Sequence, residues 1–109
     1  MEPELIQLAS QVGQVLSARR MTVGTAESCT GGLMAHALTA ISGASSYFLG
    51  GIVAYSNPVK ADLLDVKPET LEKFGAVSKE TAGEMALGVR KRIRADLGLS
   101  TTGIAGPLG

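Results

Sequence analysis

The sequence alternates between amphipathic stretches of helical length and short apolar stretches of strand length. Apolar side chains recur every three or four residues near the start, which predicts a helix over 3–20. A β-branched run predicts a buried strand over 21–26, and two glycines open an apolar helical stretch over 33–41. Further along, we expect one strand or a strand pair at 47–55, helices at 58–64, 68–74 and 78–96, and a strand at 99–104. This order predicts an α/β fold, with helix, sheet and helix layers around a mostly parallel sheet.

Short local signals predict where several of these elements begin and end. Pro58 and Pro68 suit the first turn of a helix, where the missing N–H costs nothing. Ser78 is a candidate N-cap for the long helix, and Gly98 is its candidate terminator.

Composition excludes several classes of protein. The chain has 109 residues, the size of one domain, and 45% of them are hydrophobic, which excludes a disordered chain. Ten basic and ten acidic side chains give a formal net charge of zero, and only four residues are aromatic. Direct binding of nucleic acid is therefore not expected, because it requires a basic surface or a stacking platform.

The chain also lacks the sequence features of membrane, secreted and metal-binding proteins. No run of about 18 apolar residues predicts a membrane span, and no signal peptide precedes the first helix. A single cysteine and a single histidine give neither an internal disulfide nor a usual metal ligand set. We expect a cytoplasmic protein without a membrane partner, and no cofactor is implied.

The glycines gather where predicted strands end. The segments 25–32 and 101–107 each follow a strand and are rich in glycine and hydroxyl side chains. Such turns offer backbone N–H groups to a phosphate or carboxylate, and ligands of open α/β sheets bind at the carboxyl ends of strands. We expect both loops to line one pocket, although neither matches a Walker or dinucleotide fingerprint.

Four motifs in order closely resemble the CinA C-terminal domain family. They are Thr-Ala-Glu-Ser-Cys-Thr-Gly-Gly at 25–32, Tyr-Ser-Asn at 55–57 with Lys60, Gly-Ala-Val-Ser at 75–78, and Thr-Gly-Ile-Ala-Gly-Pro at 102–107. Domains of this family continue past the last motif with further strands and a closing helix. The resemblance therefore implies that residues 1–109 form a single CinA C-terminal-like domain, shortened at its C-terminus. We also expect a homo-oligomer, because the open sheet would expose apolar surface.

The enzymatically characterised members of this family are nicotinamide mononucleotide amidohydrolases. The resemblance implies hydrolysis of a small mononucleotide substrate to nicotinate mononucleotide and ammonia. Hydrolysis of an amide needs a nucleophile and a base, and a side-chain nucleophile is favoured over a metal-bound hydroxide. The candidate nucleophiles are Ser28, Cys29, Ser45, Ser46 and Ser56.

The family pattern implies Ser45 as the nucleophile, Lys60 as the general base and Tyr55 as a proton relay or orienting group. A Ser–Lys pair requires a neutral lysine, so burial would have to lower the pKa of Lys60. Attack by a base-activated water instead of Ser45 is left open. Cys29 is interpreted as a small buried residue, because no histidine is paired with it in the sequence.

The remaining predicted site residues bind substrate. Ser28, Thr30 and Gly31 stand at a predicted helix start, which suits a phosphate or ribose, and the family motif agrees. Glu27 either stabilises this turn through the helix dipole or holds a ribose hydroxyl. The second loop is expected to line the other side through backbone groups of Thr102, Gly103, Ala105 and Gly106.

Two other hypotheses compete with the amidohydrolase. The first is a non-catalytic nucleotide-binding or competence-linked interaction module, which could dispense with Ser45, Tyr55 and Lys60. The second is a catalytic domain inactivated by shortening. The chain retains all three of those residues, which favours the enzyme.

Overall fold

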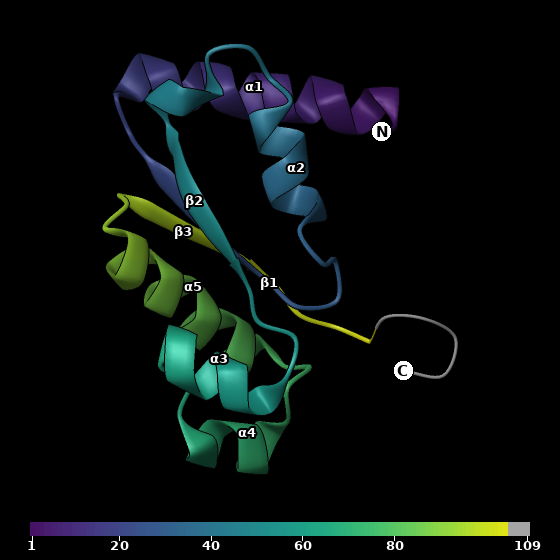
Figure 1. Ribbon diagram of the computed structural model, residues 1–109, viewed down its shortest axis with the longest axis vertical. Coiled ribbons are helices and arrows are strands. Elements are labelled where there is room, and N and C mark those ends of the chain that lie inside the picture. The colour runs from purple at the N-terminus through teal and green to yellow at the C-terminus, as the bar shows by residue number, and fades with distance from the viewer. Residues whose placement is uncertain (105–109) are drawn as a thin grey trace.

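The computed structural model describes residues 1–104 and shows helices and strands in alternation (Figure 1). The order is α1 (Pro3–Arg19), β1 (Val23–Glu27), α2 (Leu33–Thr39), the 3₁₀ turn η1 (Ala44–Ser46), β2 (Phe48–Val53), α3 (Asn57–Leu64), α4 (Pro68–Phe74), α5 (Lys79–Ile93) and β3 (Leu97–Thr101). No helix within residues 1–104 has both the length and the apolarity that a bilayer crossing needs.

The three strands form one parallel sheet in the order β2-β1-β3. Glu27, at the end of β1, is level with Val53 of β2 and Thr101 of β3, so the carboxyl ends of all three strands meet at one edge. Figure 1 shows α1 and α2 on one side of the sheet and α3, α4 and α5 on the other. The predicted α/β fold with a parallel sheet between helical layers is confirmed.

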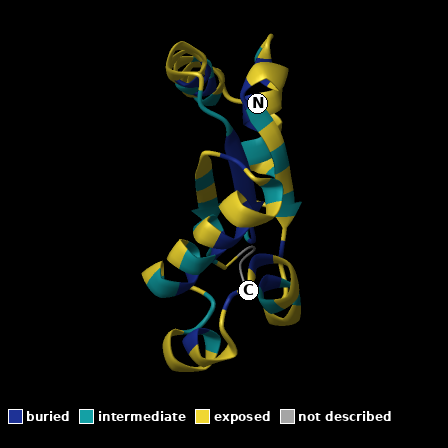
Figure 2. Ribbon diagram, turned by 90° about the vertical axis from the view of Figure 1, so that its left-hand side faces the viewer, coloured by how far each residue is buried: buried dark blue, intermediate teal, exposed yellow. Residues whose placement is uncertain are grey.

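The core consists of two apolar clusters, one on each face of β1. Every residue of β1 is buried, as expected for the central strand of a covered parallel sheet (Figure 2). Val23 packs into the cluster beneath α1 and α2, and Ala26 packs into the cluster beneath α3 and α5. Successive side chains of β1 therefore point to opposite faces of the sheet. The same alternation decides which face each of the next residues, Glu27 and Ser28, reaches.

The chain adds the second and third strands on opposite sides of β1. From β1 the chain passes through α2 to β2, and from β2 it returns through α3, α4 and α5 to β3 on the other side of β1. In open α/β sheets, a crevice for ligands forms at such a reversal, beyond the carboxyl ends of the two adjacent strands. In this chain those strands are β1 and β3.

The local signals were partly correct. Ser78 caps α5, accepting a hydrogen bond from the backbone N–H of Thr81 at 3.1 Å. Pro58 and Pro68 lie in first helical turns as predicted. Residues 47–55 hold one strand, β2, instead of a pair.

The prediction that Gly98 terminates α5 is wrong. The helix ends at Ile93, Arg94 adopts the left-handed conformation after it (φ 63°), and Gly98 lies within β3. A Cβ at position 98 would collide with the backbone carbonyl of Ala86 in α5. Glycine is needed there because helix and strand approach closely, not because the helix stops.

Candidate active site

The two glycine-rich loops lie against each other at the carboxyl ends of β1 and β3. The backbone N–H of Ser28 donates to the carbonyl of Thr101 at 3.1 Å, which extends the sheet by one residue. The hydroxyls of Thr30 and Thr101 are 2.8 Å apart. A Cβ on Gly103 would stand 3.0 Å from the sulfur of Cys29. The two loops are therefore in contact at the reversal point of the sheet, and a pocket lined by both stays a prediction.

Ser28 and Lys60 form a buried polar pair beneath these loops. The Nζ of Lys60 lies 3.0 Å from the Oγ of Ser28 and donates a second hydrogen bond to the backbone carbonyl of Tyr55 at 2.6 Å. Lys60 is 1% exposed and Ser28 is 4% exposed. The two residues come from different elements, since Ser28 follows β1 and Lys60 lies one turn into α3.

The position of Lys60 follows from the capping of α3. Ser56 caps this helix, accepting from the backbone N–H of Val59 at 3.4 Å, and Pro58 lies in its first turn. The helix thus begins at the carboxyl edge of the sheet and directs Lys60 inward, onto the face of β1 that also carries Ala26. Ser28 continues the two-residue alternation of β1 and reaches the same face.

Burial changes the acid–base behaviour of this lysine. Removal of the amine from water lowers the pKa of Lys60, and a smaller electrostatic contribution from Cys29 raises it. The net direction is downward, toward the neutral amine. A neutral amine with one N–H on the Tyr55 carbonyl has its lone pair free to accept the proton of the Ser28 hydroxyl across the same 3.0 Å.

Glu27 points to the opposite face of the sheet, where it caps α2. One carboxylate oxygen accepts from the backbone N–H of Met34 at 2.7 Å and from the Thr30 hydroxyl at 2.6 Å. The other oxygen accepts from the backbone N–H of Ala35 at 3.0 Å. The side chain is 1% exposed. Of the two interpretations of Glu27, these contacts favour stabilisation of the turn.

The structure does not bring Ser45 to Lys60. Ser45 is an exposed residue of η1 and precedes β2, whereas Tyr55 and Lys60 follow it. The six residues of β2 separate the two ends by about 20 Å at roughly 3.3 Å per residue. Within one chain, the serine hydroxyl that contacts Lys60 is that of Ser28.

The other predicted site residues are distributed around this pair. Tyr55 contacts Lys60 through its backbone carbonyl, and its side chain is 59% exposed. Thr102 donates to the carbonyl of Ala76 at 2.6 Å, which joins the second loop to the segment before α5. Gly31 lies in the first loop with a φ of 62°. Ala105 and Gly106 lie outside the described residues.

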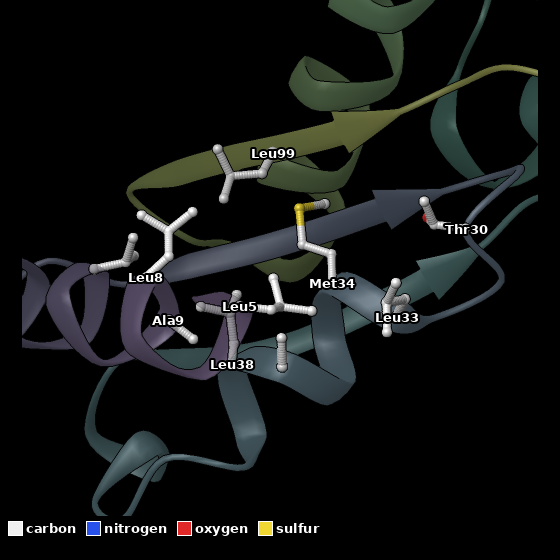
Figure 3. Close-up of a pocket in the computed structure, with 10 residues that line it drawn as sticks. Leu5, Leu8, Ala9, Thr30, Leu33, Met34, Leu38 and Leu99 are labelled. Carbon is white, nitrogen blue, oxygen red and sulfur yellow. The ribbon is translucent and has the colours of Figure 1, made fainter. Parts of the chain in front are cut away.

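A large apolar cavity lies beside this pair but on the other face of the sheet. It measures about 360 Å³ and runs between α1, α2 and β3, with Leu8, Leu33, Met34 and Leu99 among the side chains around it (Figure 3). Thr30 lies at one end of the cavity in this view. Neither Ser28 nor Lys60 lines it. Over residues 1–104, no group of three histidine, cysteine or acidic side chains could hold a metal ion.

Comparison with known proteins identifies the family. Residues 5–109 match the CinA C-terminal domain. The chain belongs to this family. It is 53% identical over 108 residues to a protein of Escherichia coli named nicotinamide-nucleotide amidohydrolase PncC, covering 99% of this chain and 66% of that protein. It is 55% identical over 98 residues to a CinA-like protein of Cytophaga hutchinsonii, covering 90% of this chain and 23% of that one.

Solved structures of CinA proteins share the fold. The crystal structure of the competence/damage inducible protein CihA from Agrobacterium tumefaciens superposes with a TM-score of 0.93 at 43% identity, over 100% of this chain and 66% of that chain. A CinA superfamily protein from Escherichia coli gives a TM-score of 0.93 at 36% identity, over 100% of this chain and 64% of that chain. The chain therefore spans about two thirds of these structures and about a quarter of the longer CinA-like proteins.

Proposed function

We propose that the chain hydrolyses the carboxamide of nicotinamide mononucleotide to nicotinate mononucleotide and ammonia, with Ser28 as nucleophile and Lys60 as general base. The observation that carries this proposal is the 3.0 Å contact between the Ser28 hydroxyl and a buried lysine. A serine becomes a nucleophile when an adjacent base takes its proton. The name of the PncC relative supports the substrate class.

The first half of the reaction forms an ester. The Oγ of Ser28 attacks the carboxamide carbon while its proton moves to the neutral Nζ of Lys60. The tetrahedral intermediate then collapses, the carbon–nitrogen bond breaks, and Lys60 returns the proton to the departing amine, which leaves as ammonia. The hydrogen bond to the Tyr55 carbonyl keeps the Lys60 amine within hydrogen-bond distance of Ser28 Oγ during these steps.

The second half regenerates the serine. A water molecule attacks the ester carbon and transfers a proton to Lys60, and the carbon–oxygen bond to Ser28 breaks as Lys60 returns that proton to Oγ. Ser28 is 4% exposed to solvent, and it lies beside the half-buried Cys29 and the exposed Thr30. The carboxamide approaches from that side.

The test is the pH dependence of ammonia release from nicotinamide mononucleotide by the folded protein and by Lys60→Met, which keeps the apolar stem of the side chain and removes the amine. The proposal predicts that kcat/KM rises with pH to a plateau, with a midpoint below the ordinary lysine value of about 10.4. The variant loses at least about 10²-fold, the lower end for a general base. A folded parent that releases no ammonia, or a Lys60→Met variant of full activity, contradicts the proposal.

A further inference from the structure

We infer that Glu27 is a positioning residue for Ser28: its carboxylate holds the turn that carries the nucleophile by occupying the start of α2. The inference rests on the proposed function and adds a residue that acts through Ser28 from the other face of the sheet. Glu27 and Ser28 are consecutive, so one peptide unit joins the carboxylate anchored on α2 to the hydroxyl that contacts Lys60.

The protons in this cluster can be assigned. A carboxylate only accepts hydrogen bonds, so the Thr30 hydroxyl uses its single proton to donate to Glu27. The neighbouring hydroxyl of Thr101 must then be the donor across the 2.8 Å that separates it from Thr30. The result is a directed chain from Thr101 through Thr30 to Glu27, which ties the loop after β1 to the end of β3.

Hydrogen bonds hold the Ser28 turn from both sides. On one side, Glu27 is bound to the N–H groups of Met34 and Ala35 in the first turn of α2. On the other, Ser28 itself donates its backbone N–H to Thr101. Gly31 closes the turn by donating to the carbonyl of Ser28 at 3.2 Å. Hydrogen bonds to a charged acceptor are stronger than those between neutral groups, so the bonds to the Glu27 carboxylate hold the turn firmly.

The same contacts explain why Glu27 cannot be replaced by its amide without moving the turn. Both carboxylate oxygens of Glu27 accept from backbone N–H groups. In Glu27→Gln, one of these positions becomes an NH₂ group that faces a donor, and one N–H of α2 loses its partner. A misplacement of about 1 Å at a nucleophile can cost about 10²-fold in rate.

Glu84 provides a matched control. It also holds a helix start, that of α4, where its carboxylate accepts from the backbone N–H of Lys67 at 2.8 Å and from the Thr70 hydroxyl at 2.6 Å. Glu84→Gln therefore makes the same chemical change at another helix start, away from Ser28. A role of Glu27 in stability alone predicts that Glu27→Gln, like Glu84→Gln, keeps the parent labelling rate wherever it is folded.

The experiment measures ammonia release and the rate at which a fluorophosphonate labels Ser28, located by mass spectrometry, in the parent, Glu27→Gln and Glu84→Gln. We expect Glu27→Gln to lose at least 10-fold in both kcat and labelling rate, with KM changed less than about two-fold, and Glu84→Gln to match the parent. Labelling of Glu27→Gln at the parent rate overturns the inference while leaving the proposed function intact. A folded parent that is neither labelled nor active overturns the proposed function, and this inference with it.

A second variant covers the case in which Glu27→Gln does not fold by circular dichroism. Thr30→Val keeps the shape of the side chain and removes the hydroxyl between Glu27 and Thr101. We expect this variant to lose 3-fold to 10-fold in labelling rate and kcat. An unchanged rate in folded Thr30→Val overturns the inference by itself.

Discussion

Gly88 marks the place where α5 presses on the helix that carries Lys60. A Cβ at position 88 would stand 2.6 Å from the carbonyl carbon of Leu64 and 2.9 Å from its Cα. Leu64 is the last residue of α3, one turn beyond Lys60. Because ordinary contacts begin near 3.5 Å and the carbonyl oxygen of Leu64 lies nearer still, Gly88→Ala would push α3 away from α5 by more than about 1 Å. The backbone cannot rotate aside as a flexible side chain could.

The expected result of Gly88→Ala is a less stable and less active protein. Overpacking of a core costs about 1–3 kcal/mol, and the higher helix propensity of alanine offsets about 1 kcal/mol of it. We expect a net loss of up to about 2 kcal/mol, measured by urea unfolding. The shift of α3 also stretches the 3.0 Å contact of Lys60 with Ser28, so we expect ammonia release to fall by at least about 10-fold.

Gly83→Ala is the control, because it lies in the same helix with no heavy atom within 4 Å of the added Cβ. Helix propensity alone then applies, and we expect about 0.5–1 kcal/mol of added stability with unchanged activity. Gly88→Ala as stable and as active as Gly83→Ala would refute the close packing of α3 on α5 and the argument that this packing positions Lys60.

Two further predictions concern stability. Burial lowers the pKa of Lys60 in the folded state, so between the folded and unfolded pKa values the unfolded chain binds more protons and the free energy of unfolding rises with pH. Lys60→Met should flatten this rise in urea titrations at several pH values. An unchanged slope would contradict a lowered pKa. Ser78→Ala removes the cap that accepts from the Thr81 N–H and should cost about 0.5–2 kcal/mol in thermal unfolding, whereas a loss below 0.3 kcal/mol would show that the cap is not formed in solution.

The fold was predictable from the sequence because its helices and strands differ clearly in hydrophobic period. The helical repeat that begins at Leu5 and the β-branched run around Val23 each suit one structure only. Pro58, Pro68 and Ser78 fixed three helix starts through local chemistry. The end of α5 was not predictable, because the role of Gly98 depends on Ala86 of the helix packed against it.

The candidate site was predicted only in part. The sequence singled out Lys60 and the two glycine-rich loops, and the loops are in contact in the structure; the functional roles of these residues stay predictions. The partner of Lys60 was not identified, because the choice between Ser28 and Ser45 depends on which end of β2 each serine lies near. One signal was available in the sequence. A serine directly after a buried strand, opposite in phase to Glu27, faces the other side of the sheet from Glu27, and α3 with Lys60 lies on that side.

The most direct test of this account compares two serine variants in one assay, ammonia release from nicotinamide mononucleotide. Ser28 contacts Lys60, and Ser45 lies at the far end of β2. The account predicts that folded Ser28→Ala loses at least about 10³-fold in kcat and that folded Ser45→Ala keeps the parent rate. Loss of activity in Ser45→Ala with retention in Ser28→Ala would contradict the Ser28–Lys60 pair.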